Sequence, residues 1–466
     1  MQQQYTQFQA NVIPEAPKFG RDVITTLAVA LVVATIAYGA MLSVEEPIGI
    51  MALVFGIAYI GLAWKLPHMA LATGLALAPM QNDVSGGVGP FKLSLGELSV
   101  FLCFIVYIIR WFTKTCEMKW GPFLAPMLVY LAVCLSSSLI NWSSEAQTAY
   151  LQMLIYFIVA PVTYANLVKR VELLNIAYYL LIGMCMFLSI AGLASGTFYI
   201  FGLHKNGVGS SLAVGVIVAT ELFLVTKKRS HKAIMGCCLA LITGGLVFTL
   251  SRGAWISAIV GYFIVIGTRG KMKSILQATL VLVPLIAAFW LMLPEDKKTY
   301  ATDFDSKSRN ISARYETIDT ASRLFSQNPI FGVGIGLRKE IDATNVFWIT
   351  LAETGVQGLI SLFMVHFVCL AMIFKTQRFV SRDDPRFSLL VLGGALLWAK
   401  IMHGIVDHYW SRGPLLIAWA GAGMATRIYY HEQQRLKALN IEIMKFRRKK
   451  LLKSRAVTVE LLDPPI

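Results

Sequence analysis

Long apolar runs recur along almost the whole chain, and they constrain its fold more than any other feature. One such run extends from Ala233 to Leu250, and another follows from Ala254 to Gly267. Because a helix needs about 20 apolar residues to cross a bilayer core of roughly 30 Å, each run is a candidate membrane span. The runs are continuous instead of alternating, which favours helices over barrel strands. The sequence therefore predicts an all-α polytopic membrane protein.

The composition agrees, since only 15% of the 466 residues are charged and 56% are hydrophobic. Hydropathy read over a window of about 19 residues predicts a bundle of about fourteen transmembrane helices. The segment 23–43 is too long for the core of a cleavable signal peptide and is expected to remain as the first span. The expected spans lie near 23–43, 47–64, 66–80, 93–111, 122–140, 149–168, 173–194, 208–226, 233–250, 254–267, 275–293, 346–374, 387–405 and 413–430.

Positive charge is distributed unevenly between the gaps that separate these spans. Lys and Arg gather in alternate gaps and in the tail after Arg427. The positive-inside rule then places both termini in the cytoplasm. The expected organisation is a cytoplasmic tail at 1–22, a bundle of about eleven spans at 23–293, a large outer loop at 294–345, about three spans at 346–430 and a basic cytoplasmic tail at 431–466.

Lysines and arginines that are expected to face outward run against this preference for the cytoplasmic side, and they are the functional candidates. Arg252 lies in Ser251-Arg252-Gly253, a short break between two spans. An arginine stays charged and presents a planar donor fork that suits phosphate oxygens, although it could also be a snorkelling anchor at a helix end. Lys205 lies in the polar turn His204-Lys205-Asn206, where a solvated loop is the alternative.

The outer loop and the end of the thirteenth span carry the remaining candidates. The segment from Ser312 to Gln327 predicts an amphipathic helix on the membrane surface, with Arg314 near its start. Lys400 lies inside a span, where a lysine either faces a polar partner or snorkels to the interface. The further candidates are Arg338 and Asp342 in the loop, Asn345 and Glu353 after it, and His403, Asp407, His408 and Arg412 beyond Lys400. Their spacing indicates no metal site.

Four sequence pieces together resemble the O-antigen ligase and O-antigen/exopolysaccharide polymerase family (Wzy/WaaL type). The resemblance covers roughly residues 200–360, and the earlier spans share only general hydropathy with the family. The pieces are His204-Lys205-Asn206 with Gly209, Ser251-Arg252-Gly253, Arg314 leading into Pro329-Ile330-Phe331-Gly332-Val333-Gly334, and Asn345 to Gly358 with Leu351, Glu353 and Gly355.

This resemblance implies a glycosyltransferase of the bacterial inner membrane with a large periplasmic loop. Such proteins transfer a glycan from undecaprenyl diphosphate to an acceptor glycan, without metal or cofactor. The implied partners are the lipid-linked glycan, the acceptor glycan, membrane lipids and other polysaccharide export proteins, with no nucleic acid. Arg252 is the first candidate for binding the diphosphate, with Arg314, Arg338 and Lys205 assisting. Supporting roles fall to Ser251, Asn206, Asn345, Lys400, His403, His408 and Arg412.

The chain departs from the family at one position. Ligases place a histidine immediately before the asparagine equivalent to Asn345, and this chain has Thr344. A threonine hydroxyl cannot act as general base at neutral pH, which leaves His204, Asp342 and Glu353 as candidates. Glu353 could instead brace the helix. The preferred function is a repeat-unit polymerase, and the alternatives are a ligase, a flippase or transporter, and a non-catalytic partner of an export complex.

Overall fold

The computed structural model describes residues 47–82, 93–140, 142–270, 272–302, 309–337, 345–407 and 412–460. These residues form helices joined by short turns, and no strand occurs among them. The expected span 23–43 lies outside the described residues. The helices are α3 Pro47–Lys65, α4 Pro67–Leu77, α5 Leu95–Phe112, α6 Leu124–Ser138, α7 Ser144–Leu154, η1 Ile155–Val159, α8 Ala160–Asn166, η2 Val171–Leu174, α9 Asn175–Ser195, α10 Lys205–Val225, α11 Arg229–Phe248, α12 Arg252–Arg269, α13 Met272–Met292, α14 Glu295–Thr302, α15 Arg309–Gln327, α16 Val346–Gln377, α17 Pro385–Val406 and α18 Gly413–Glu460.

Local sequence signals explain where several helices begin and end. A capping box starts α5, because the Ser94 hydroxyl accepts from the Glu97 amide while the Glu97 carboxylate accepts from the Ser94 amide. Asp384 caps α17, whose first residue is Pro385. Gly196 and Gly270 end α9 and α12 in the left-handed conformation that glycine adopts without strain.

Seven of the described helical segments are long and apolar enough to cross a membrane. They are Leu95–Phe112, Ser144–Asn166, Val171–Ser195, Lys205–Val225, Arg229–Phe248, Val346–Gln377 and Pro385–Val406. Described helices also coincide with the other expected spans after the first. The expectation of fourteen spans stays a prediction.

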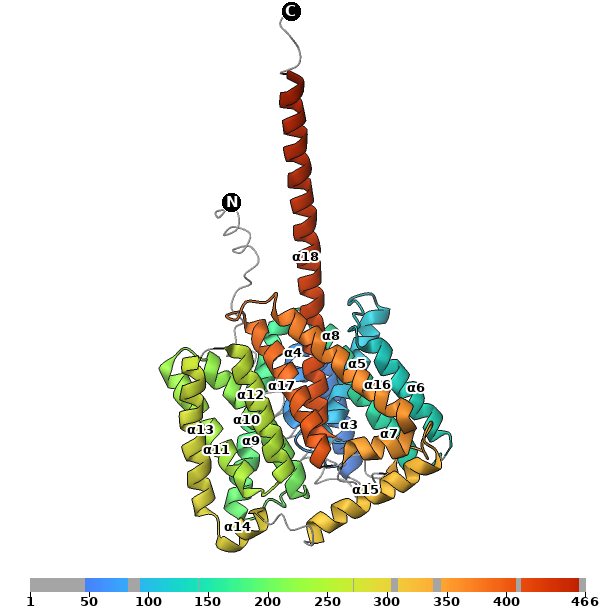
Figure 1. The fold of residues 1–466 in the computed structure, drawn as a ribbon, viewed down its shortest axis with the longest axis vertical. Helices are drawn as coiled ribbons and strands as arrows, with labels where there is room; N and C mark the ends of the chain where they lie inside the picture. The colour runs from blue at the N-terminus through green and yellow to red at the C-terminus, as the bar shows by residue number, and fades with distance from the viewer. Residues whose placement is uncertain are drawn as a thin grey trace, which may run out of the picture.

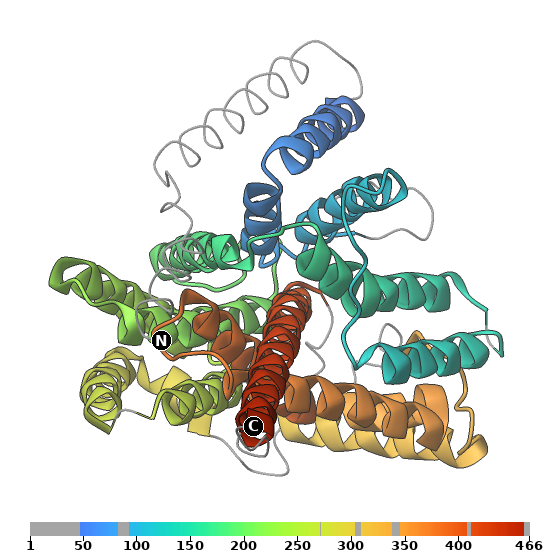
Figure 2. The same ribbon diagram turned by 90° about the horizontal axis from the view of Figure 1, so that it is seen from above.

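The helices form a bundle with two dissimilar ends (Figure 1). The helix α15 lies obliquely across one end, which we call the loop end, and α18 projects from the opposite end, the tail end. Viewed from above, α18 emerges from among helices of both the N-terminal and C-terminal parts of the chain (Figure 2). The segment expected as an amphipathic helix at 312–327 is thus helical, within α15.

Three neighbouring helices set the geometry of the loop end. Close approach at Gly209 and Ser251, and again at Ile217 and Gly261, shows that α10 and α12 run parallel. The helix α17 runs antiparallel to α12, since Gly253 lies against His403 while the Ser257 hydroxyl donates to the Ala399 carbonyl at 3.0 Å. The beginnings of α10 and α12 therefore lie beside the end of α17.

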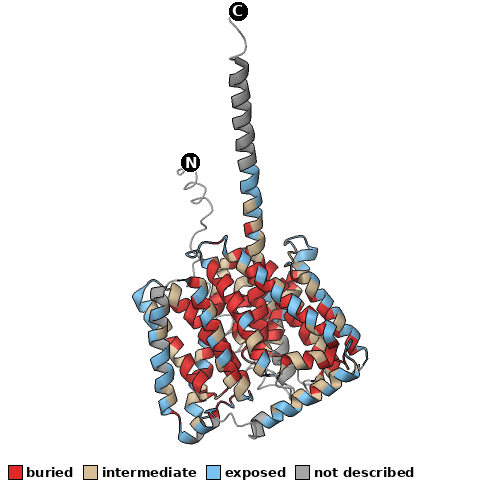
Figure 3. Ribbon diagram, viewed as in Figure 1, coloured by how far each residue is buried: buried red, intermediate tan, exposed pale blue. Residues whose placement is uncertain are grey.

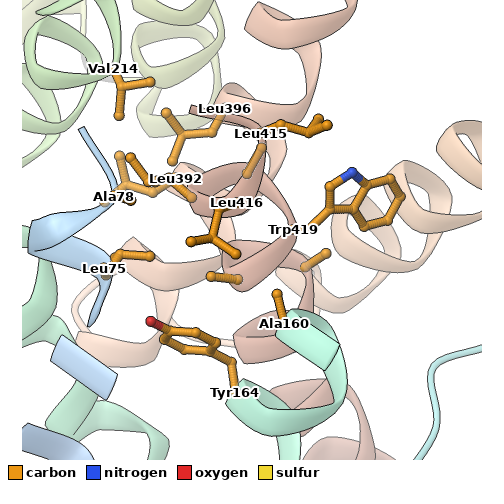
Figure 4. Packing of buried hydrophobic residues seen from close by; sticks show 14 of the residues in the cluster. Leu75, Ala78, Ala160, Tyr164, Val214, Leu392, Leu396, Leu415, Leu416 and Trp419 are labelled. Carbon is orange, nitrogen blue, oxygen red and sulfur yellow. The ribbon is translucent and has the colours of Figure 1, made fainter. Parts of the chain in front are cut away.

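The buried residues concentrate in the middle of the bundle, and outer helices such as α13 are largely exposed (Figure 3). Trp419 and Leu416 of α18 lie in this core with Tyr164 of α8 and Leu392 of α17 (Figure 4). Three helices, one of them far from the other two in sequence, thus share one apolar core, which fixes the helix ends that carry the candidate residues.

Two helices differ in form from the expected spans. A break at Gly355 interrupts α16, where φ is 68° and ψ is −170°. The helix α18 continues for 48 residues, through the expected boundary between residues 430 and 431. The expected last span and the expected basic tail, as far as residue 460, therefore lie in one helix, which projects beyond the bundle (Figure 1).

Candidate functional site

The break in α16 is closed by the glycine-rich turn that follows α15. The amide of Val333 donates to the Ala352 carbonyl at 2.9 Å, and the amide of Gly334 donates to the Glu353 carbonyl at 3.2 Å. These are two of the carbonyls that lose their helical partners at a break after residue 354. Unsatisfied backbone groups are costly in a membrane, so the turn stabilises the broken helix.

Glycine is required on both sides of this contact. Gly332, Gly334 and Gly336 all have positive φ, as does Gly355. A Cβ atom at Gly355 would overlap with the Ile330 carbonyl, and the Val356 amide donates to the Pro329 carbonyl at 2.9 Å. The glycine-rich segment 332–336 is therefore a docked turn.

Glu353 lies at the centre of this contact and is 1% exposed. Its Oε1 accepts from the Gly336 amide at 2.8 Å, and its backbone carbonyl also accepts from the Ser137 hydroxyl of α6. Since the carboxylate already holds the turn, this geometry favours the bracing role over the role of general base.

The turn Ser251-Arg252-Gly253 lies at the loop end, where α12 begins. Ser251 is the N-cap residue and Arg252 the first residue of the helix; in the same way, His204 caps α10 and Lys205 is its first residue. The Ser251 hydroxyl is buried and has no hydrogen-bond partner in the described part of the chain. Two parallel helices thus begin side by side, each with a cation in its first turn. Helix N-termini carry partial positive charge, so the pair attracts anions.

Two of the predicted residues donate hydrogen bonds to the last turn of α17. Arg314 of α15 donates its Nη1 to the Val406 carbonyl at 2.8 Å, and Asn345 donates its Nδ2 to the Ile405 carbonyl at 2.9 Å. The last carbonyls of a helix lack helical donors, so both side chains cap α17. Asn345 also caps α16 by accepting from the Phe347 amide. The Arg314 Nε is buried without a partner among the described residues.

A buried polar cluster lies inside the same helix end. Lys400 and His403 of α17 are 2% and 0% exposed, and Asp407 is 3% exposed. The Lys400 Nζ lies 3.4 Å from the Ser210 Oγ on α10, and the His403 Nδ1 lies 3.3 Å from the same oxygen. The His403 Nε2 is 4.0 Å from the Asp407 Oδ2. Lys400 thus faces polar partners and does not snorkel.

A second polar network reaches α10 from the N-terminal helices. Arg412 donates its backbone amide to the Tyr156 hydroxyl at 2.7 Å and its Nη1 to the Gln81 carbonyl. The Gln81 Nε2 in turn donates to the Gly207 carbonyl and to the Ser211 hydroxyl, both at 3.2 Å. Adjacent serines of α10 therefore contact two networks, one through Arg412 and one through His403. The sequence pattern did not single out Gln81 or Tyr156.

His204 is exposed at the start of α10. Its Nε2 lies 3.1 Å from the Tyr199 hydroxyl, and its Nδ1 accepts from the Asn206 amide at 3.3 Å. Arg338, Asp342, Thr344 and His408 lie outside the described residues. No group of three or more His, Cys, Asp or Glu side chains in the described ranges could hold a metal ion.

Arg269 and Arg382, which fall in gaps expected to face the cytoplasm, lie at the tail end. Arg269 at the end of α12 forms an ion pair with Glu221 of α10, and its Nη1 donates to the Arg382 carbonyl at 2.7 Å. Both side chains of the pair are buried. The charge pattern did not single out this pair, although a glutamate inside an apolar run indicates a buried partner.

The residues 237–363 match the model of the O-antigen ligase family (Wzy_C). The match extends from α11 to the middle of α16, so it includes Arg252, Arg314 and Glu353 and excludes α10 and α17. No curated protein matches the chain. The apolar helices and this match agree with a multi-pass membrane protein of polysaccharide biosynthesis. The match confirms the predicted resemblance to the O-antigen ligase/polymerase family over this part of the chain.

Proposed function

We propose that this protein polymerises oligosaccharide repeats carried on undecaprenyl diphosphate, at the periplasmic face of the bacterial inner membrane. The observation that carries the proposal is the position of three cationic residues around the end of α17: Lys205 and Arg252 lie in the first turns of α10 and α12, and Arg314 donates to the Val406 carbonyl. Cationic residues together with two neighbouring helix N-termini are a combination suited to a diphosphate.

The reaction would be a displacement at the anomeric carbon of the donor glycan. A hydroxyl oxygen of the acceptor glycan forms the new bond to this carbon, and the bond between the carbon and the diphosphate oxygen breaks. The electron pair of the broken bond stays on undecaprenyl diphosphate, whose negative charge increases. Arg252 and Arg314 would stabilise that charge as it develops, which lowers the barrier. Arg338 is proposed to assist them.

The proton of the acceptor hydroxyl needs a base within hydrogen-bond reach. We assign this role to His204, because it is exposed and lies beside Lys205 at the start of α10. Glu353 is assigned to bracing the glycine-rich turn, since its carboxylate already accepts from Gly336. Asp342 is the second candidate for the base.

The test is a transfer assay with purified protein in lipid nanodiscs and an undecaprenyl-diphosphate-linked repeat. Longer lipid-linked glycans support polymerisation, and their loss in His204→Ala with retained donor binding supports the assigned base. Transfer to lipid A core in place of elongation would identify a ligase. Movement of the lipid-linked glycan across vesicles without a new glycosidic bond would identify a flippase.

A further inference from the structure

The last turn of α17 contacts every described element that carries a candidate diphosphate-binding residue. It holds Arg314 of α15 through the Val406 carbonyl. It meets α12 at Gly253, the neighbour of Arg252. It meets α10 at Ser210, one and a half turns after Lys205. The separation of these three cations therefore depends on where this turn lies.

His403 is the residue of that turn that faces both α10 and α12. A Cβ atom added to Gly253 would lie 3.0 Å from the His403 Cδ2 and 3.2 Å from its Nε2, so the glycine lets α12 approach the ring closely. On the other side of the ring, Nδ1 lies 3.3 Å from the Ser210 hydroxyl. The imidazole thus fills the junction of the three helices.

A purely packing role would be served equally well by an apolar side chain. Buried polar groups are costly unless they are hydrogen-bonded, so hydrogen bonds between two helices favour the arrangement of the helices in which they form. Here Lys400 and His403 share the Ser210 hydroxyl, and Asp407 lies 4.0 Å from the imidazole. The cluster therefore specifies the register between α10 and α17.

We propose that His403 is a positioning residue for glycan transfer, which fixes Arg252 and Arg314 relative to each other through the last turn of α17. The inference rests on the proposed function and goes beyond the family match, because α17 lies outside residues 237–363. His403 is fully buried, so it acts through the two arginines and not by contact with substrate.

The kinetic test compares His403→Leu, which removes the hydrogen bond, with His403→Gln, which keeps a polar side chain toward Ser210. A small misplacement of catalytic groups can cost about 100-fold in rate, so we expect His403→Leu to lower kcat by about that factor with KM for the lipid-linked donor changed less than about 3-fold. The kcat of His403→Gln should be at least about tenfold higher than the kcat of His403→Leu.

His366 provides the matched control. It is also a buried histidine, but its Nδ1 lies 2.8 Å from the Leu362 carbonyl within its own helix, α16. His366→Leu should leave kcat unchanged at equal melting temperature. An equal fall of kcat in His366→Leu and His403→Leu would overturn the positioning role. A rise of KM without a change in kcat would also overturn it.

A second measurement does not depend on activity. Hydrogen exchange of the His403→Leu protein should be faster than wild type in peptides from the first turn of α12 and from α15, and unchanged at Arg269. Unchanged exchange in both peptides would contradict the proposal. If wild-type protein makes no polymer, the proposed function fails, and the exchange data still decide whether His403 fixes the two arginines.

Discussion

Arg314 donates its Nη1 to the carbonyl of Val406 at 2.8 Å, and this bond ties the loop helix α15 to the last turn of α17. The same turn meets α12 beside Arg252, through the contact between Gly253 and His403. Two arginines that are 62 residues apart in the sequence are thus held by one helix end. The proposed diphosphate site depends on this junction more than on either loop alone.

Substitution of Arg314 should therefore affect activity beyond the loss of one charge. Arg314→Lys keeps the charge but lacks the guanidinium fork that caps Val406 and leaves Nε for a ligand. We expect Arg314→Ala to lower kcat by about 100-fold or more, with Arg314→Lys recovering little. Transfer assays in nanodiscs measure both.

Arg323 is the control on the same helix, because it is exposed and bonds locally to Thr320. Arg323→Ala should keep kcat within about twofold, as expected for an exposed charge. Full activity of Arg314→Lys would contradict the role of the guanidinium.

Gly355→Ala should destabilise the protein strongly. The new Cβ would overlap with the Ile330 carbonyl, and the positive φ adds strain. We expect a loss of about 2–5 kcal/mol in the free energy of unfolding, because the glycine-rich turn can no longer dock. Thermal melts in detergent measure this loss of stability.

Gly183→Ala in α9 is the control, because a Cβ there meets no atom within 4 Å. It should change stability by no more than about 0.5 kcal/mol. Equal melting temperatures for the two variants would rule out this account of the break.

Removing one partner of the buried ion pair between Glu221 and Arg269 should destabilise the protein more than removing both partners. Glu221→Gln leaves the Arg269 guanidinium buried without its counter-charge, and such a change costs about 3–5 kcal/mol. The double variant Glu221→Leu with Arg269→Met should be more stable than the single variant, because no buried charge remains. Melting temperatures of the three proteins test this. A Glu221→Gln protein as stable as wild type would show that the pair does not hold α10 to α12.

Stability should also fall in acid through Glu432, which lies beyond the expected last span. Burial alone would raise the pKa of its carboxyl, but the hydrogen bond with His431 and the charges of Arg386 and Arg435 lower the pKa below its ordinary 4.5. The contribution is therefore full above about pH 4.5 and is lost as the pH falls through the lower folded value. The difference in melting temperature between wild type and Glu432→Gln should be constant near neutral pH. In acid the two melting temperatures should converge. A constant difference throughout would contradict this linkage.

The sequence predicted the helical architecture well because apolar runs and their flanking charges are local signals. The turn before Arg252 and the helix around Arg314 both occur where their patterns indicated. Of the described residues predicted to face outward, Arg314 and Asn345 contact the last turn of α17 at the loop end, whereas Arg269 lies at the tail end.

What the sequence could not supply were contacts between distant segments. Hydropathy marks 346–374 as one run, but the break at Gly355 exists because the turn at Val333 and Gly334 supplies the missing donors. The burial of Lys400 likewise depends on Ser210, which is 190 residues away. Local pattern cannot report such partners, and so snorkelling stayed open until the structure was known.

The most direct test of the central claim is glycan transfer by wild-type and Arg252→Ala protein in nanodiscs, with an undecaprenyl-diphosphate-linked repeat as both donor and acceptor. We expect wild type to form longer lipid-linked glycans and Arg252→Ala to be slower by about 100- to 1,000-fold, since it lacks a cation where the diphosphate charge develops. Arg323→Ala serves as the control and should match wild type. Polymer formed by Arg252→Ala at the wild-type rate would contradict the account.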